Sequence, residues 1–141
     1  MRSITSYNRI VIKIGSAVLA DSDGRVNHTI LSSISEDVAW LIKNGKEVLI
    51  VSSGAIALGR KKIKFSENLT LPESQALAAH GQIELISAWK KHLNKFSILV
   101  SQILLTPRDT ELKLSSKNAQ QTVNKLLEVG CLPIINENDT T

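Results

Sequence analysis

A turn of small residues between two apolar segments is the first place in the sequence where chemistry can be expected. The segment 48–51 is a short β-branched run typical of a buried parallel strand, and it ends at Ser52-Ser53-Gly54 before a segment of helical character. A strand-to-helix turn of this kind leaves backbone N–H groups free to bind an anion. Gly54 lets a ligand approach the backbone because it has no Cβ. The turn therefore predicts a binding site.

Lys13 is the second candidate, because it is a cation near the end of the apolar segment 9–14, just before Gly15 and Ser16. Two interpretations are open from these residues alone. The side chain can extend along the sheet edge so that its ammonium group reaches solvent, or it can bind a phosphate group at the carboxyl end of a strand. The surrounding elements decide between the two.

Apolar runs and amphipathic segments alternate along the chain. Strands are predicted at 9–14, 48–51, 98–105 and 132–135, with helices ending near 44, spanning 70–93 and lying around 119–127. This alternation predicts an α/β fold, a three-layer α/β/α sandwich with a mainly parallel sheet, right-handed crossovers and helices on both faces.

Four polar loops follow the four predicted strands, at 15–16, 52–54, 106–109 and 136–139. The carboxyl ends of parallel strands meet at one edge of a sheet, and ligands bind there. We therefore expect Lys13, Ser53, Asn136 and Asp139 to lie on the same edge. This convergence favours the phosphate-binding interpretation of Lys13.

Local signals set the limits of the helices. Gly45 suits the left-handed position after a last helical turn, and Thr70 with Glu73 has the form of a capping box, with Pro72 in the first turn. The helix that follows is expected to bury a face of Ala76, Ala79, Ile83, Ile86 and Leu93. Within it, Gly81 favours the close approach of another segment, because a mid-helix glycine costs up to ~1 kcal/mol relative to alanine.

The composition limits the class of protein. A chain of 141 residues suits one domain, and residues 1–8 are expected to form a polar tail. A net charge of +4 suits a small anionic ligand, and aromatic residues at 4% argue against a nucleic-acid partner. No apolar run approaches the ~20 residues that span a bilayer, so no membrane association is expected. The single cysteine, Cys131, is expected to be a buried thiol, and it favours a cytoplasmic location.

Several familiar motifs are incomplete. Gly54 and Gly59 have the spacing of a P-loop, but Arg60 follows where a lysine is required, and the basic run 60–64 is interpreted as a solvated loop. No Gly-x-Gly-x-x-Gly follows a strand, which weakens a dinucleotide-binding interpretation.

The histidines and tryptophans are also assigned to structure. His28, His80 and His92 lack the spacing of metal ligands, so no metal site is predicted and each is expected on a helix surface. Trp40 and Trp89 are expected to pack in the core.

Six segments carry a resemblance to a known family. They are 12–16 (IKIGS), 51–59 (VSSGAIALG), 75–82, 104–106 with Asp109, 118–119 with Thr122, and 133–140 (PIINENDT). In this order they resemble the glutamate 5-kinase family of the amino-acid kinase superfamily. The opening Lys-x-Gly-Ser is shared across the superfamily, whereas the Ser-Ser-Gly-Ala-Ile-Ala and Asn-Glu-Asn-Asp blocks are specific. The departures are modest: residues 115–117 lack an aromatic, and Thr141 replaces an aliphatic residue.

The resemblance implies the N-terminal half of the amino-acid kinase fold and an ATP- and Mg²⁺-dependent phosphorylation. The substrate would be the side-chain carboxylate of L-glutamate and the product γ-glutamyl phosphate, the first step of proline biosynthesis. By the same resemblance Lys13 is the catalytic residue, and with Gly15 and Ser16 it binds ATP. The residues that would hold glutamate are Ser53, Gly54, Ala55, Asn136 and Asp139.

The chemistry of that reaction agrees with the residues present. A glutamate side chain of pKa ~4.3 is ionised at neutral pH, so the nucleophile needs no general base. Catalysis then depends on alignment and on neutralising anions that repel each other, which a lysine, backbone N–H groups and Mg²⁺ can do.

The resemblance covers residues 9–141 as the glutamate-binding part of a kinase domain, and the nucleotide-binding half is not within them. In a full-length protein it further implies a homo-oligomer and feedback inhibition by proline. Two alternatives stay open. One is a non-catalytic amino-acid-binding module, and the other is a sister kinase with another carboxylate or carbamate substrate, which the Asn-Glu-Asn-Asp block disfavours.

Overall fold

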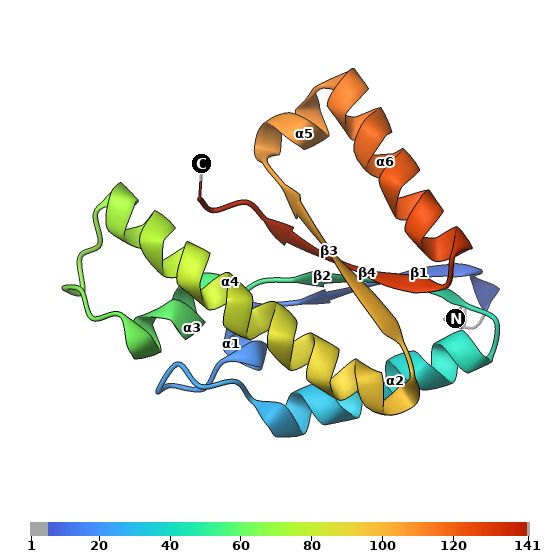
Figure 1. Ribbon diagram of the computed structural model, residues 1–141, viewed down its shortest axis with the longest axis horizontal. Coiled ribbons are helices and arrows are strands. Elements are labelled where there is room, and N and C mark those ends of the chain that lie inside the picture. Colours follow the sequence, from blue (N-terminus) through green and yellow to red (C-terminus); the bar gives the residue numbers. More distant parts are fainter. Residues whose placement is uncertain (1–5, 141) are drawn as a thin grey trace.

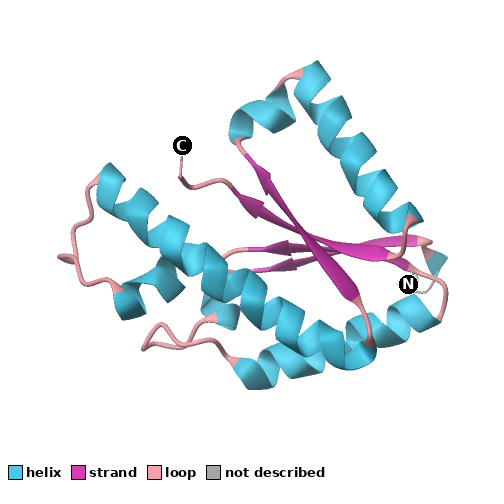
Figure 2. Cartoon of the chain, viewed as in Figure 1, coloured by secondary structure: helices cyan, strands magenta, loops and turns pink. Residues whose placement is uncertain are grey.

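The computed structural model describes residues 6–140 and shows one four-stranded parallel sheet with helices on both faces (Figures 1 and 2). The elements are β1 (Arg9–Ile14), α1 (Ser16–Leu19), α2 (His28–Lys43), β2 (Glu47–Ser52), α3 (Ala55–Lys62), α4 (Leu71–Leu93), η2 (Asn94–Phe96), β3 (Leu99–Leu105), α5 (Pro107–Glu111), α6 (Lys113–Glu128) and β4 (Cys131–Glu137). The strand order is β1-β2-β4-β3, and every neighbouring pair is parallel. The predicted fold class is confirmed. Residues 1–5 of the predicted tail, and Thr141, lie outside the described residues.

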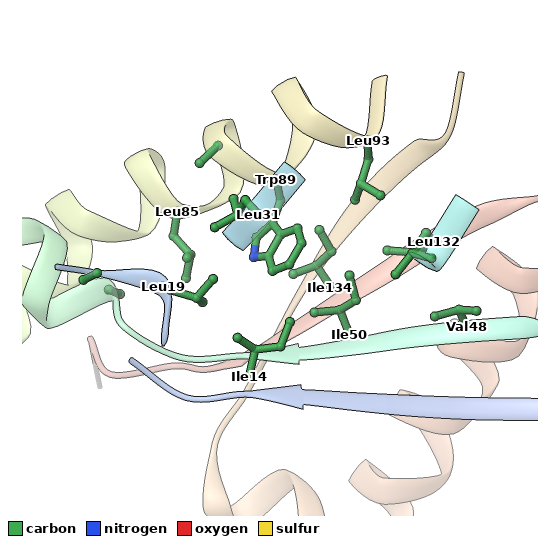
Figure 3. Close-up of a cluster of buried hydrophobic side chains, with 14 of the residues drawn as sticks. Ile14, Leu19, Leu31, Val48, Ile50, Leu85, Trp89, Leu93, Leu132 and Ile134 are labelled. Carbon is green, nitrogen blue, oxygen red and sulfur yellow. The ribbon is translucent and has the colours of Figure 1, made fainter. Parts of the chain in front are cut away.

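The helices bury one face of the sheet more completely than the other. Helices α2, α3 and α4 lie on one face, and α5 and α6 lie on the other (Figure 1). The main core is on the side of α2 and α4, where Trp89 and a set of Leu, Ile and Val side chains pack together (Figure 3). On the other face α6 buries none of its residues fully, and the side chain of Val11 on β1 is 60% exposed. Within residues 6–140 no helix is long and apolar enough to cross a membrane.

Two predicted helix limits, the start of α4 and the end of α2, are confirmed by their local geometry. The Glu73 carboxylate accepts hydrogen bonds from the Thr70 backbone N–H (2.8 Å) and the Thr70 hydroxyl (2.7 Å), which closes the capping box at the start of α4. These two bonds lower the pKa of Glu73. Gly45 follows α2 with φ of 76°, in the left-handed region that glycine tolerates.

Helices α3 and α4 cross with their backbones in contact. A Cβ built at Gly81 would lie 1.7 Å from the carbonyl oxygen of Ala55, and one built at Gly59 would lie 2.1 Å from the carbonyl oxygen of Leu77. Real Cβ atoms essentially never come within 3.0 Å of a heavy atom from another part of the chain. The close approach predicted at Gly81 is confirmed, and it brings the start of α3 against the middle of α4.

The junction between β2 and β4 is short. Whereas β1 and β2 are in register over their whole length, the β2–β4 pairing that the described residues show consists of Ile50 with Ile134 and Val51 with Ile135. Pro133, which immediately precedes that pairing, has no N–H to donate. A cavity of about 90 Å³ lies where the two strands diverge, lined among others by Val48 and Leu132.

Three expectations about packing are wrong. The buried face of α4 consists of Leu77, Ala78, Gly81, Leu85, Ala88, Trp89, His92 and Leu93. Of the predicted face Leu93 is fully buried and Ile86 is partly buried against the core. Ile83 is 65% exposed. The face is rotated because α4 packs against α3 through Gly81, which has no side chain to contribute to an apolar periodicity.

The predicted positions of Trp40 and His92 are also wrong. Trp89 is fully buried, as predicted, but Trp40 is 55% exposed on α2. His92 is 4% exposed, although it was expected on a helix surface. It lies where α4 crosses the start of α2, and its Nε2 is 3.0 Å from Nδ1 of His28. Burial is the main reason why the pKa of His92 falls below its ordinary value.

Candidate functional site

A cavity of about 630 Å³ lies at the carboxyl ends of β1, β2 and β4. Its lining includes Lys13, Ser53, Asn136 and Asp139. The prediction that these four residues share one edge of the sheet is confirmed. A neighbouring cavity of about 540 Å³ contains none of the four and lies beside the turn at residues 21–24.

The β2–α3 turn has the geometry expected of a binding turn. Gly54 has φ of 111° and immediately precedes α3. The first hydrogen bond of α3 runs from the backbone N–H of Leu58 to the carbonyl oxygen of Gly54 (3.1 Å). The N–H groups of Ala55, Ile56 and Ala57 precede that bond, and the first turn of a helix has no intrahelical acceptors for them. All three residues line the cavity, so this end of α3 is suited to an anion.

Ser53 fixes the turn to the neighbouring strand. Its backbone N–H (3.1 Å) and its hydroxyl (3.2 Å) both donate to the carbonyl oxygen of Ile14, at the end of β1. Because the hydroxyl proton is used in this bond, the oxygen of Ser53 is left to act as an acceptor. The same contact holds the end of β1, which carries Lys13, against the turn. Lys13 itself is exposed, in register with Val51 on β2, and both line the cavity.

The end of β4 supplies the opposite wall. Asn136 is 4% exposed, and its Nδ2 donates to Oε1 of Gln82 on α4 at 2.6 Å. Asp139 follows two residues after the end of β4 and is half-buried. Burial raises the pKa of the Asp139 carboxyl above its ordinary value of 3.8, and the negative charge of Glu137 raises it further. A cationic group of a ligand would stabilise this carboxylate, since an opposite charge within a few ångströms favours the ionised form.

Charged side chains of both signs line the cavity. Lys13 and Arg60 are the cations among its lining residues, and Glu137 and Asp139 are the carboxylates. Arg60 lies one turn after Ile56 on α3 and also donates from Nη2 to the carbonyl oxygen of Glu67 (3.3 Å). This balance suits a ligand that carries both an ammonium group and carboxylates.

Not every predicted loop contributes to the cavity. Ser16 lines it, whereas Gly15 is not among its lining residues. The segment 106–109 is absent from the lining as well. Its carboxylate, Asp109, instead accepts hydrogen bonds from the backbone N–H and the hydroxyl of Thr106 (both 2.7 Å) and caps α5.

Sequence reasoning missed three residues of this region. Arg60 was assigned to a solvated loop, but it lies on the face of α3 that carries Ile56 and Ala57, and helical spacing from the turn could have found it. Glu137 belongs to the Asn-Glu-Asn-Asp block at 136–139, from which only Asn136 and Asp139 were predicted to bind a ligand. Gln82 was not singled out as a site residue, and no local signal in the sequence connects it with Asn136, 54 residues away.

Metal binding by protein side chains alone has no support in the described residues. Between residues 6 and 140 there is no group of three or more His, Cys, Asp or Glu side chains that could hold a metal ion. Cys131 is a buried free thiol on β4, as predicted, and it lies 3.0 Å from the hydroxyl oxygen of Ser101.

Comparisons with known proteins agree with the geometry. The model of the amino acid kinase family matches residues 8–141. The chain is 51% identical over 140 residues to a glutamate 5-kinase of Agrobacterium fabrum, covering 99% of this chain and 36% of that protein. It is 48% identical over 139 residues to a glutamate 5-kinase of Bradyrhizobium diazoefficiens, covering 97% of this chain and 37% of that protein. The chain thus spans little more than a third of these relatives, and the resemblance seen in its motifs is confirmed. It belongs to the amino acid kinase family.

Proposed function

We propose that this chain is the glutamate-binding part of a glutamate 5-kinase, which transfers a phosphoryl group from ATP to the side-chain carboxylate of L-glutamate. The observation that carries the proposal is the cavity at the strand ends, where Lys13, the start of α3, Asn136 and Asp139 come together. The names of the relatives, each about half identical to this chain, support the same substrate.

Each group of the substrate has a counterpart in the cavity. The ammonium group of glutamate would pair with the Asp139 carboxylate and with the acceptor oxygen of Ser53. A carboxylate would bind at the N–H groups that begin α3, with Arg60 as a nearby cation. Such a cavity positions the ionised side chain as a nucleophile, and no group in it has to remove a proton.

Lys13 is proposed to neutralise the phosphates. Its ammonium group, on the exposed end of β1, would bind the phosphates of ATP and stabilise the phosphoryl group in transfer. Gly15 and Ser16, which follow directly, would contribute backbone N–H groups to the same phosphates. Since a kinase transition state is stabilised by position and charge, a single well-placed lysine at this point contributes strongly.

The donor set also fits the metal that a kinase requires. Mg²⁺ is commonly bound through one or two carboxylates together with substrate phosphates and water. Glu137 lies at the cavity and, unlike Asp139, is not assigned to the ammonium group of glutamate, so it fits a metal that arrives with the nucleotide. The ion would supply charge neutralisation between the two substrates. Feedback by proline and assembly into a homo-oligomer stay predictions.

Direct titration of the 141-residue chain with L-glutamate tests the proposal. We expect saturable binding that Asp139→Asn weakens by about 10- to 100-fold, since a charge-assisted hydrogen bond contributes roughly 1.5–3 kcal/mol. Lys61→Ala is the control, because Lys61 is exposed on α3 and is not among the lining residues of this cavity. Absence of binding, or equal binding by the Asp139 variant, would contradict the proposal.

A hydroxamate assay for γ-glutamyl phosphate separates the kinase from a binding module. Phosphoryl transfer needs both substrates held together, and this chain spans about 36% of its relatives. We expect the 141-residue chain to bind glutamate without forming product, and a protein that also carries the rest of the kinase domain to form product that depends on Lys13. Product from the 141-residue chain alone would show that this part is catalytically sufficient.

A further inference from the structure

One hydrogen bond links the candidate site to a helix that has no role in the proposed chemistry. Nδ2 of Asn136, on β4, donates to Oε1 of Gln82, in the middle of α4, at 2.6 Å. Asn136 is 4% exposed and lines the cavity, whereas Gln82 is half-buried and is not among the lining residues of that cavity. Gln82 therefore contacts the wall of the cavity through Asn136.

The bond decides which atom of the Asn136 amide is offered to a ligand. A primary amide carries two N–H donors and one acceptor oxygen, and Nδ2 and Oδ1 diverge from the same carbon atom. Fixing Nδ2 on Gln82 therefore also fixes the direction of Oδ1. If the Asn136 amide alone turned over, its oxygen would face the oxygen of Gln82 and the two acceptors would share no proton, so the orientation shown holds as long as Gln82 presents its oxygen.

The helix that carries Gln82 is itself fixed against two other parts of the site. Next to Gln82, Gly81 is in backbone contact with Ala55 at the start of α3. Two turns further along, Nε1 of the buried Trp89 donates to the hydroxyl oxygen of Ser52, at the end of β2 (3.0 Å). Helix α4 thus contacts the start of α3 and the ends of β2 and β4, three of the segments that line the cavity, and it holds Gln82 in place between them.

We infer that Gln82 is a positioning residue that orients the Asn136 amide so that its oxygen accepts a hydrogen bond from the ammonium group of the amino-acid substrate. The inference rests on the proposed function for the identity of the ligand. Asp139 supplies the charge for the same ammonium group, and Asn136 supplies a directed neutral acceptor. The two together recognise an α-amino acid better than a simple dicarboxylate.

Two substitutions at Gln82 separate a positioning role from mere packing. Gln82→Met has a similar size and no acceptor, so it removes the bond to Asn136. Gln82→Glu keeps an acceptor oxygen at the same place and should retain the bond. Gln120→Met makes the same chemical change at an exposed position of α6 and serves as the control.

The measurement is an NMR titration of the ¹⁵N-labelled 141-residue chain with L-glutamate, together with thermal unfolding. For Gln82→Met we expect on the order of tenfold weaker binding and a shifted side-chain amide signal of Asn136. For Gln82→Glu we expect binding within about threefold of the unsubstituted chain, and for Gln120→Met no change. Should Gln82→Met fail to fold, Gln82→Ala, which also removes the acceptor oxygen, takes its place with the same expected result.

Two results would overturn the inference. One is a folded Gln82→Met chain that binds glutamate as well as the unsubstituted chain, and the other is a folded Gln82→Glu chain that binds about tenfold more weakly. An unsubstituted chain that does not respond to glutamate would overturn the proposed function instead. In that case the Asn136 side-chain signal still reports whether Gln82 orients the amide: a signal shifted in Gln82→Met and retained in Gln82→Glu supports the positioning, and an unchanged signal in both refutes it.

Discussion

Substitution of Gly81 by alanine tests how tightly the site depends on the contact between α3 and α4. The new Cβ would lie 1.7 Å from the Ala55 carbonyl oxygen and 2.7 Å from the backbone nitrogen of Gly59. Both neighbours are backbone atoms, so rotation of a side chain cannot relieve the clash. The helices must separate by more than about 1 Å to restore an ordinary contact.

The magnitude follows from two opposing effects. Overpacking a close contact costs about 1–3 kcal/mol, and the upper end applies here because the backbone itself must shift. Alanine recovers about 1 kcal/mol of helix propensity relative to glycine. We therefore expect Gly81→Ala to destabilise the chain by about 2 kcal/mol, which lowers Tm by about 6–8 °C for a domain of this size.

Urea unfolding and thermal unfolding measure this effect, and a glutamate titration measures its consequence for the site. Separation of the helices moves Ala55, so we also expect weaker binding of glutamate. Gly15→Ala is the control for stability, because Gly15 has φ of −78° and no atom within 4 Å of a built Cβ. A Gly81→Ala chain as stable as the unsubstituted one, or more stable, would refute the close contact, since propensity would then be the only effect of the change.

Three further outcomes are expected. Ser52→Ala leaves the indole N–H of buried Trp89 without its acceptor and should cost about 1–3 kcal/mol of unfolding free energy, measured by urea titration. The pKa of His92 is lowered in the folded state, so the unfolded chain binds protons more readily. The free energy of unfolding should therefore fall as the pH drops below 6.5. In His92→Leu this free energy should depend less steeply on pH between 7.5 and 5.5. The pKa of Asp139 is raised by burial and by Glu137, so glutamate binding should already weaken above pH 3.8 as the solution is acidified. In Glu137→Gln, a glutamate titration should show this loss of binding at a lower pH. Identical pH profiles of the two chains would contradict the influence of Glu137 on Asp139.

The parallel sheet and its binding edge could be predicted because their signals are local. A buried parallel strand is a short apolar run, and the polar residues that end such runs at Lys13, Ser53 and Asn136 must meet once the strands are parallel. The capping box at Thr70 and the left-handed Gly45 depend on a few neighbouring residues, so they too could be predicted from the sequence.

The orientation of α4 could not be predicted in this way, because it depends on a partner distant in the sequence. The face that packs on α3 is built from Ala78 and Gly81, whose small size allows the contact, whereas the bulkier Ile83 is 65% exposed. Apolar periodicity gives weight to Ile83 and none to Gly81. For the same reason the burial of His92 and the pairing of Gln82 with Asn136 became apparent only in three dimensions.

The short junction between β2 and β4 has a consequence for how the molecule opens. The sheet consists of two longer ladders, β1–β2 and β4–β3, joined through Ile50–Ile134 and Val51–Ile135, with Pro133 at the start of the junction. Solvent can enter this junction from the amino ends of the strands, where the ladders already diverge, so amide hydrogens there should exchange by openings smaller than global unfolding. The two residue pairs of the junction lie toward the strand ends that carry Ser53 and Asn136. A ligand that bridges these two residues would therefore join the two ladders across this short junction, and slower hydrogen exchange along β2 and β4 would record its binding.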